Sequence, residues 1–214
     1  MTDKRHLRAT ARTARAAFVT GGKPEIAVPD AFAVLLAATP VRFERSREAS
    51  LVERDAACLD FARHERAVGD GRASILATYA PLEDEADPAP LARAAMAAGY
   101  TLALPHVIDR ATPLRFLAWH PEDALAAGPF GLSQPHAHAA EVTPHVILTP
   151  LVAFDSALNR IGQGAGHYDR AFAAFPQARR IGVAFSVQQV DAIAADPWDM
   201  PLDAIVTETG WIPR

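Results

Sequence analysis

The fold is decided by Val146-Ile147-Leu148-Thr149-Pro150-Leu151-Val152-Ala153-Phe154 and, shortly after it, Arg160-Ile161-Gly162-Gln163-Gly164-Ala165-Gly166-His167-Tyr168-Asp169-Arg170. The apolar run predicts a strand, the alternating glycines predict a loop, and residues 168–175 predict a helix. Glycines allow positive φ and close approach to a ligand, and amides at a helix N-terminus attract anions. The order strand, glycine loop, helix therefore favours a phosphate cradle, with Arg160 and Arg170 adding positive charge at its borders. The spacing matches neither GxxxxGK nor GxGxxG, so a tight structural turn is an equal alternative for the loop alone.

Strands and helices alternate along the rest of the chain. We expect helices over 3–18, 31–38, 47–66 and 88–98, and strands over 73–79, 100–104, 114–119, 181–185 and 204–207. The strand over 100–104 is expected to stop at Pro105, and residues 121–145 are expected to be mostly loop. This alternation predicts an α/β protein with a mainly parallel sheet. In such sheets ligands bind beyond the carboxyl ends of strands, where both the glycine loop and an acidic loop at 83–87 lie.

Composition limits the class of protein. The chain has 214 residues, of which 50% are hydrophobic and 21% charged, which predicts one globular domain over 1–214. A net charge of −4 argues against a broad nucleic-acid surface. The single cysteine, Cys58, excludes an intrachain disulfide. The basic N-terminus lacks the apolar core of a secretory signal, and the run 31–38 is too short for a membrane helix, so we expect a cytoplasmic protein without a membrane partner.

The first helix carries a basic stripe of Lys4, Arg8, Arg12 and Arg15 beside a narrow apolar stripe. Like charges four residues apart on a helix repel one another. The stripe therefore either faces an anion or is a solvated helix surface.

Carboxylates near the ends of predicted strands offer a second kind of site. Asp169, in the first turn of its helix, is either a favourable partner for the helix dipole or a Mg²⁺ ligand. Asp199, before the last strand, supplies a second carboxylate that can meet it. The acidic loop is either solvated or recognises an amine-rich heterocycle through one carboxylate; its acidic members are Glu83, Asp84, Glu85 and Asp87.

A zinc site and a covalent nucleophile are less favoured. The zinc candidate consists of His136, His138, Glu141 and His145. Exposed loop histidines are the better interpretation, because the segment is rich in Pro and Ala and no HExxH or CxxC accompanies it. No GxSxG elbow marks a nucleophilic serine.

Several of these segments resemble the 5-formyltetrahydrofolate cyclo-ligases. The pattern of that family is a strand with P-x-x-x-F-D followed by R-x-G-x-G-x-G-Y-Y-D, which 150–155 and 160–169 resemble. Residues 4–8 (Lys-Arg-His-Leu-Arg) are similar to its N-terminal K-x-x-L-R, Leu104-Pro105 to the Pro after its central strand, and 199–203 to its H-D-x-x-x-D. The resemblance implies a three-layer α/β/α fold, Rossmann-like and similar to sugar-phosphate isomerases and CoA transferases.

The resemblance also implies an activity: ATP- and Mg²⁺-dependent closure of 5-formyltetrahydrofolate to 5,10-methenyltetrahydrofolate. Arg160 and Tyr168 would be catalytic, and Asp169 and Asp199 would hold Mg²⁺. The implied ATP-binding residues are Lys4, Arg8, Arg160, Gly162, Gln163, Gly164, Ala165, Gly166, His167 and Tyr168. The implied substrate-binding residues are Glu85, Gly164, Gly166, His167 and Tyr168.

Three residues depart from the family pattern. His167 replaces the first Tyr, Trp198 replaces the His before the metal Asp, and Ala165 stands where Gly or Lys is common. Glu83 and Asp87 remain alternatives to Glu85. A non-catalytic folate- or nucleotide-binding regulator, with RNA as a further partner in one version, is the alternative function, and an ATP-independent isomerase or transferase is a third. We expect a monomer, an insertion within 20–72, and no nucleic-acid partner for the enzyme.

Overall fold

The protein is built on one central sheet, seen in a computed structural model that describes residues 3–39 and 74–214. The sheet has seven strands in the order β11-β10-β9-β6-β1-β2-β3. Neighbours from β10 to β2 run parallel, and β11 and β3 are antiparallel at the two edges. The strand bounds are β1 Ile75–Ala77, β2 Thr101–His106, β3 Arg115–Ala118, β6 Val146–Pro150, β9 Arg179–Val183, β10 Ala204–Thr207 and β11 Gly210–Pro213.

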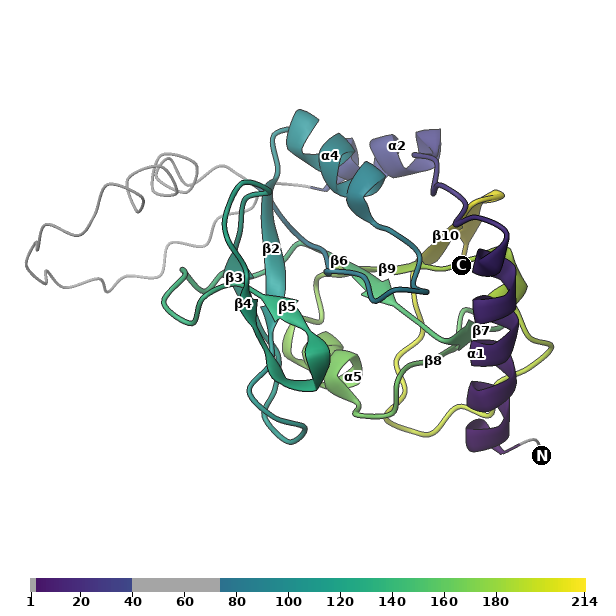
Figure 1. The fold of residues 1–214 in the computed structure, drawn as a ribbon. Coiled ribbons are helices and arrows are strands. Elements are labelled where there is room, and N and C mark those ends of the chain that lie inside the picture. The colour runs from purple at the N-terminus through teal and green to yellow at the C-terminus, as the bar shows by residue number, and fades with distance from the viewer. Residues whose placement is uncertain (1–2, 40–73) are drawn as a thin grey trace, which may run out of the picture.

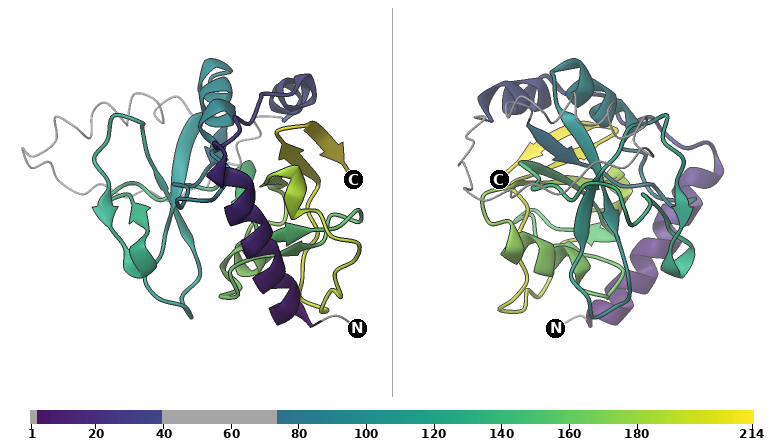
Figure 2. Two further views of the ribbon diagram at one scale, coloured as in Figure 1. Left: turned by 45° about the vertical axis from the view of Figure 1, so that its right-hand side comes forward. Right: turned by 90° about the vertical axis from the view of Figure 1, so that its left-hand side faces the viewer.

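Helices cover both faces of this sheet (Figure 1). Helices α2 (Asp30–Ala38) and α4 (Ala89–Ala97) lie on one face, and α5 (His167–Ala174) lies on the other. The long helix α1 (Lys4–Thr20) packs against β7 (Ala153–Phe154) and the short helix η2 (Ser186–Gln188). Figure 2 shows α1 beside the green and yellow C-terminal elements in its left-hand view. The predicted three-layer α/β fold with a mainly parallel sheet is confirmed.

The core is divided between the two faces of the sheet because neighbouring strand residues point in opposite directions. In β6, Leu148 belongs to the same buried cluster as Phe32 of α2, and its neighbour Ile147 belongs to the cluster that contains Phe172 of α5; all four side chains are fully buried. The continuous apolar character of β6 therefore reflects a strand covered by helices on both faces.

The expected strand over 146–154 is wrong in its extent, because the chain leaves the sheet after Pro150. The side-chain amide of Gln188 donates to the carbonyls of Leu151 and Val152 at 2.7 and 3.1 Å, and so satisfies the backbone where the strand breaks. Chain pairing resumes between β7 and β8 (Arg160–Ile161), which form a separate antiparallel pair.

Pro105 does not end β2, which continues to His106 opposite Arg115. Proline is tolerated there because β1 pairs with β2 only as far as Ala103, so no ladder bond from residue 105 toward β1 is lost. Residues 121–145 are mostly loop, as predicted, but the short elements β4 (Ala126–Ala127), η1 (Pro129–Gly131, a short helix) and β5 (Ser133–Gln134) within them were not predicted. Strand β11 was also not predicted.

The remaining predictions are a helix and an insertion between the first helix and β1, and the absence of a membrane helix. The helix over 47–66, with Cys58, lies outside the described residues, as does much of the expected insertion. Over 3–39 and 74–214, none of the helices has the length and apolar character needed to cross a membrane.

Candidate functional site

The basic stripe of α1 faces the rest of the molecule. Asp3 begins the helix by accepting a hydrogen bond from the Arg5 amide at 3.0 Å. The Lys4 ammonium then lies 2.5 Å from Asp196 and 2.6 Å from Asp199, and Arg8 Nε donates to the Gly162 carbonyl at 2.9 Å. The N-terminal helix therefore joins the glycine loop and the C-terminal acidic segment at one site.

The Lys4 and Asp199 charges stabilise each other. Partial burial opposes charge on Lys4, but its contacts with Asp196 and Asp199 outweigh that and raise its pKa. Burial likewise opposes charge on Asp199, and hydrogen bonds from Lys4 and the Asp196 amide nevertheless lower its pKa. Both groups are therefore charged at neutral pH.

The glycine loop needs glycine at two positions. Gly164 has φ +104°, and Gly166 has φ +68° where it caps the N-terminus of α5. An added Cβ at Gly164 would lie 3.7 Å from Arg8 Cζ, an ordinary contact, so the backbone angle rather than space requires the glycine. The left-handed residues turn the chain from β8 into α5.

Arg160 is a buried cation beside the two candidate metal carboxylates. Its Nη2 donates to Asp169 Oδ1 at 2.7 Å, and its guanidinium lies 5.0 Å from the ring centre of Phe172. Its side chain is only 5% exposed, and its Nε has no hydrogen-bond partner among the described residues. Burial lowers its pKa, opposed by Asp169 and, more weakly, by Asp199. Arg160 therefore lies within electrostatic reach of both carboxylates.

Glu85 is the acidic-loop carboxylate that joins this site. It is 5% exposed; Oε2 accepts from the Leu82 amide at 3.1 Å, and Oε1 accepts from Gln163 Nε2 at 3.3 Å. Glu83 and Asp87 are exposed. Of the three alternatives, Glu85 is the one in contact with the glycine loop.

Tyr168 and His167 follow the loop at the start of α5. Burial and the nearby Glu85 charge raise the pKa of the Tyr168 phenol, so it is a neutral hydroxyl. Burial and Arg170 lower the pKa of His167, whose Nδ1 lies 3.1 Å from Arg170 Nη2. Because arginine can only donate, Nδ1 is the acceptor and the neutral ring carries its proton on Nε2.

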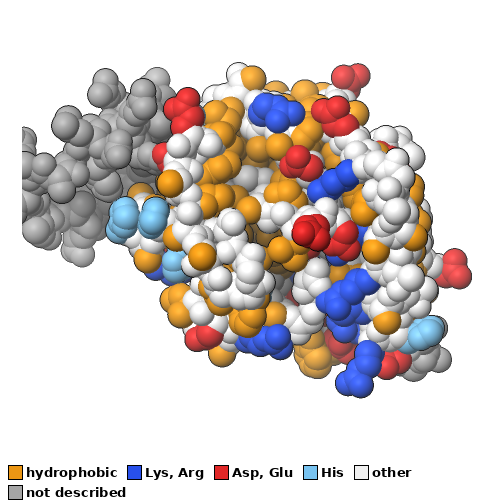
Figure 3. All heavy atoms as spheres, in the orientation of Figure 1, with side chains coloured by type: hydrophobic (Ala, Val, Ile, Leu, Met, Phe, Trp, Pro, Cys, Tyr) orange, Lys and Arg blue, Asp and Glu red, His pale blue; other side chains and the backbone are white. Residues whose placement is uncertain are grey.

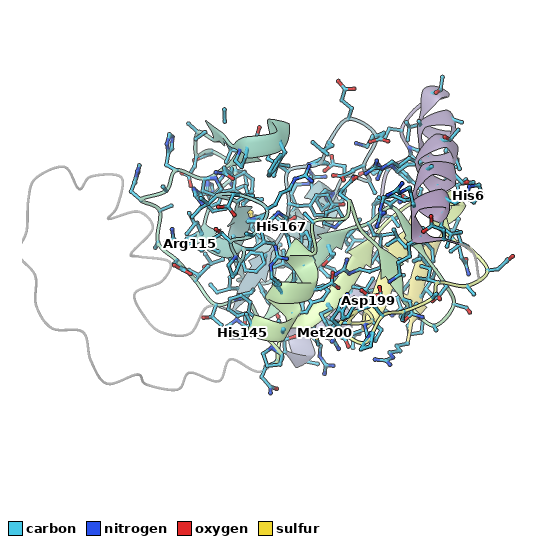
Figure 4. The ribbon with its side chains drawn as sticks, turned by 90° about the horizontal axis from the view of Figure 1, so that it is seen from below. His6, Arg115, His145, His167, Asp199 and Met200 are labelled. Carbon is cyan, nitrogen blue, oxygen red and sulfur yellow. The ribbon has the colours of Figure 1, made fainter. Side chains whose placement is uncertain are left out.

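Figure 3 shows a hollow in one face of the molecule, with acidic and basic side chains gathered along its border on the α1 side. In Figure 4, His167 is at the start of α5, and Asp199 is on the loop that lies between α5 and α1 in this view. The predicted nucleotide and metal residues thus come together from both ends of the chain.

The four residues of the less favoured zinc candidate do not come together. His136 and His138 stack with ring centres 5.4 Å apart, Glu141 accepts from Arg115 at 2.8 Å, and His145 Nδ1 accepts from the Ile75 amide at 3.0 Å. Figure 4 labels His145 and Arg115 at separate places. Nowhere in 3–39 or 74–214 do three or more His, Cys, Asp or Glu side chains form a group that could hold a metal ion.

Two contacts of the site were not predicted. Asp196 and Asp199 both form an ion pair with Lys4. The position of Asp196 three residues before Asp199 was the feature of the sequence from which its place in the site could have been predicted. Arg15 forms a two-point ion pair with Asp84 at 2.9 and 3.0 Å. The basic stripe placed Arg15 on one face of the helix with the other cations, but it did not predict the acidic partner of Arg15. Trp198, one of the departures from the family pattern, is 69% exposed.

The fold and the site define an α/β protein in which a glycine loop lies between cationic and acidic side chains drawn from distant parts of the chain. The chain belongs to the 5-formyltetrahydrofolate cyclo-ligase family, since the sequence model of that family matches residues 44–208. It is thus a member of a ligase family of folate metabolism.

Individual relatives agree with this assignment. The 5-formyltetrahydrofolate cyclo-ligase of Escherichia coli K12 is 33% identical over 143 residues, covering 63% of this chain and 78% of the relative. The protein of the same name from Haemophilus influenzae is 36% identical over 95 residues, covering 42% and 51%.

Solved structures are similar in fold. The 5,10-methenyltetrahydrofolate synthetase of Aquifex aeolicus matches with a TM-score of 0.60 and 24% identity, over 98% of this chain and 92% of that one. The synthetase of Mycoplasma pneumoniae matches with a TM-score of 0.57 and 20% identity, over 97% and 99%. At these identities the likeness supports the fold alone.

Proposed function

We propose that this protein uses ATP and Mg²⁺ to convert 5-formyltetrahydrofolate to 5,10-methenyltetrahydrofolate, with ADP and phosphate as the other products. The observation that carries the proposal is that the cations of α1, the glycine loop and the two aspartates Asp196 and Asp199 meet close to Arg160. This arrangement of charges suits a triphosphate and a cation. The choice of a folate as the second substrate rests on membership of the family.

The triphosphate would lie along the glycine loop. Lys4 and Arg8 would contact its phosphates from α1, and Arg160 would contact them from β8. The loop amides over 162–168, next to the N-terminus of α5, would complete the cradle. Phosphoryl transfer depends on positioning and positive charge rather than on a protein nucleophile, and these groups provide both.

Asp169 and Asp199 would hold the magnesium ion. Carboxylate oxygens are the hard ligands that Mg²⁺ takes, and it commonly uses one or two of them together with substrate phosphates and water, so the absence of a larger acidic cluster from the described residues is compatible with it. When bound, the ion would neutralise charge on the phosphate oxygens. Each carboxylate is paired with a cationic side chain, Arg160 or Lys4, so nucleotide binding would exchange ion-pair partners.

The chemistry would take two steps. The formyl oxygen forms a bond to the γ-phosphorus as the bond to ADP breaks, which converts a poor leaving group into a phosphate. N10 then attacks the formyl carbon and loses its proton to solvent, the ring closes, and the carbon–oxygen bond breaks as phosphate leaves. Because the second step is intramolecular, holding N10 near the formyl carbon contributes much of the rate.

Three side chains would orient the folate. The buried carboxylate of Glu85 would accept hydrogen bonds from the amino-pyrimidine edge. Tyr168 would donate its neutral hydroxyl toward the formyl end, and His167 would present Nε2–H where relatives have a tyrosine hydroxyl. The neutral state of both rings supports a role as donors rather than as charged groups.

The test is formation of the methenyl chromophore in the near ultraviolet from 5-formyltetrahydrofolate and Mg²⁺, with and without ATP. An ATP-dependent signal is expected. Binding of folate or ATP in titration calorimetry without a chromophore would instead favour the non-catalytic regulator, and a signal without ATP would favour the isomerase or transferase alternative.

The proposal treats residues 1–214 as one domain, which is supported by the joining of residues 4–8 to residues 162 and 196–199 in a single site. A cytoplasmic location and a monomeric state stay predictions.

A further inference from the structure

Arg15 is the buried cation of α1, and the proposed reaction does not use it. Its side chain is 3% exposed, whereas that of Asp84 is 32% exposed. Nε and Nη2 of Arg15 donate to the two Asp84 oxygens at 3.0 and 2.9 Å, and Nη1 donates to the Leu151 carbonyl at 3.3 Å. A planar guanidinium that uses both of its edges fixes the orientation of what it binds.

The acidic loop is held by the α1 side of the molecule at three consecutive residues. Lys23, just after α1, donates to the Glu83 carbonyl at 3.4 Å, and Arg15 binds the Asp84 carboxylate. Glu85 accepts a hydrogen bond from the side-chain amide of Gln163, and the side-chain oxygen of Gln163 accepts one from Arg12 of α1. Glu85 is therefore linked to α1 through Gln163.

These contacts matter because the loop has little structure of its own. Residues 80–87 contain no helix or strand. Beyond the α1 side, the Tyr79 hydroxyl donates to the Ala86 carbonyl at 2.6 Å and holds the far end of the loop. Among the contacts of the described residues on the α1 side, only the Arg15–Asp84 ion pair joins two donors to two carboxylate oxygens. Asp84 is the residue directly before Glu85.

We propose that Arg15 is a positioning residue that fixes the Glu85 carboxylate for the substrate by holding Asp84. The inference rests on the proposed function in taking Glu85 as the folate ligand. Arg15 shares α1 with Lys4 and Arg8, so one rigid helix sets the position of both the phosphate contacts and the pterin contact. The placement of Glu85 itself is independent of what the site binds.

The experiment compares Arg15→Met and Asp84→Asn with Arg5→Met. Arg5 lies on the same helix, is exposed, and has no side-chain partner among the described residues. KM for 5-formyltetrahydrofolate and KM for ATP are measured well below each variant's melting temperature. We expect KM for 5-formyltetrahydrofolate to rise about tenfold in Arg15→Met and in Asp84→Asn, because each loses one charge-assisted contact. KM for ATP in these variants, and both KM values of Arg5→Met, should stay near wild type. The double variant should be no worse than the worse single variant, because both substitutions remove one contact.

Amide hydrogen exchange of residues 82–86 gives a second readout that does not depend on turnover. It should be faster in Arg15→Met than in Arg5→Met, because the Leu82 amide bonds to Glu85. Unchanged exchange in that segment overturns the positioning role whether or not the protein is a ligase. Equal changes in both KM values, or a folate KM like that of Arg5→Met, also overturn it. A wild-type protein that makes no methenyl product refutes the proposed function, and the exchange measurement then decides the positioning role alone.

Discussion

Glu85→Gln should impair folate use selectively. The substitution keeps the size of the side chain but removes its charge. The glutamine carbonyl can accept from either the Leu82 amide or Gln163, and the amide NH2 that replaces the other oxygen can only donate. Because Glu85 is 5% exposed, its hydrogen bonds to a ligand would form away from water. A hydrogen bond to a charged group contributes about 1.5–3 kcal/mol, and 1.4 kcal/mol corresponds to about tenfold. We therefore expect KM for 5-formyltetrahydrofolate to rise roughly 10- to 150-fold, with KM for ATP within about twofold of wild type.

The matched controls are Glu83→Gln and Asp87→Asn, which remove the same charge from exposed positions of the same loop. Steady-state kinetics with the methenyl chromophore as the signal, at saturating concentrations of the fixed substrate, separate the two KM values. The reasoning is refuted if either control raises the folate KM as much as Glu85→Gln does, or if Glu85→Gln leaves it unchanged.

Three further changes test other parts of the site and the fold. Asp169→Asn should lower kcat/KM for ATP on the order of 100-fold and raise the Mg²⁺ concentration needed for half-maximal rate; an unchanged Mg²⁺ dependence removes this residue from the metal role. Gly164→Ala, at φ +104°, should weaken ATP binding measured by calorimetry, whereas Gly210→Ala, at φ +135° in the β10–β11 turn, should cost similar stability and leave ATP binding intact. Burial opposes charge on Asp203, but three hydrogen bonds from Arg180 lower the pKa of this carboxyl below its value in the unfolded chain. The contribution of Asp203 to the free energy of unfolding is therefore full above about pH 4 and is lost as the pH falls through the folded-state pKa. Asp203→Asn should therefore be about 1–2 kcal/mol less stable to urea at pH 7, and this difference should shrink in acid; a difference that is constant with pH contradicts the linkage.

The parts of the fold that depend on local sequence were predictable. The glycines at 164 and 166, directly before a helix, predicted a turn with left-handed residues, and both have positive φ. The alternation of strands and helices predicted the mainly parallel sheet, and the family resemblance implied helices on both of its faces. Each of these follows from neighbours in the sequence, which is why one chain was enough to infer them.

Contacts between distant segments were not predictable. Lys4 and Asp196 are 192 positions apart, and Arg15 and Asp84 are 69 apart. The stripe on α1 showed that cations share one face, but it carried no information on which acidic residues would lie opposite. The break after Pro150 had the same origin, because the carbonyls of Leu151 and Val152 are satisfied by Gln188, far along the chain.

The choice among the acidic-loop residues shows how packing adds to sequence. Glu83, Glu85 and Asp87 are similar in charge and within four positions of one another, so a motif in uncertain register could not separate them. Burial separates them, because only the Glu85 side chain of these three turns inward to meet Gln163. The sequence did not define the chemical state of His167 either, because that state depends on what the ring contacts. The contact of Nδ1 with Arg170 defines its tautomer.

The most direct test of the central claim is the amount of ADP formed for each 5,10-methenyltetrahydrofolate made by the purified protein with Mg²⁺ and 5-formyltetrahydrofolate. We predict a ratio of one, with no methenyl product when ATP is omitted. Methenyl product without ADP, or ATP hydrolysis that 5-formyltetrahydrofolate does not stimulate, would contradict the proposed phosphorylation of the formyl oxygen.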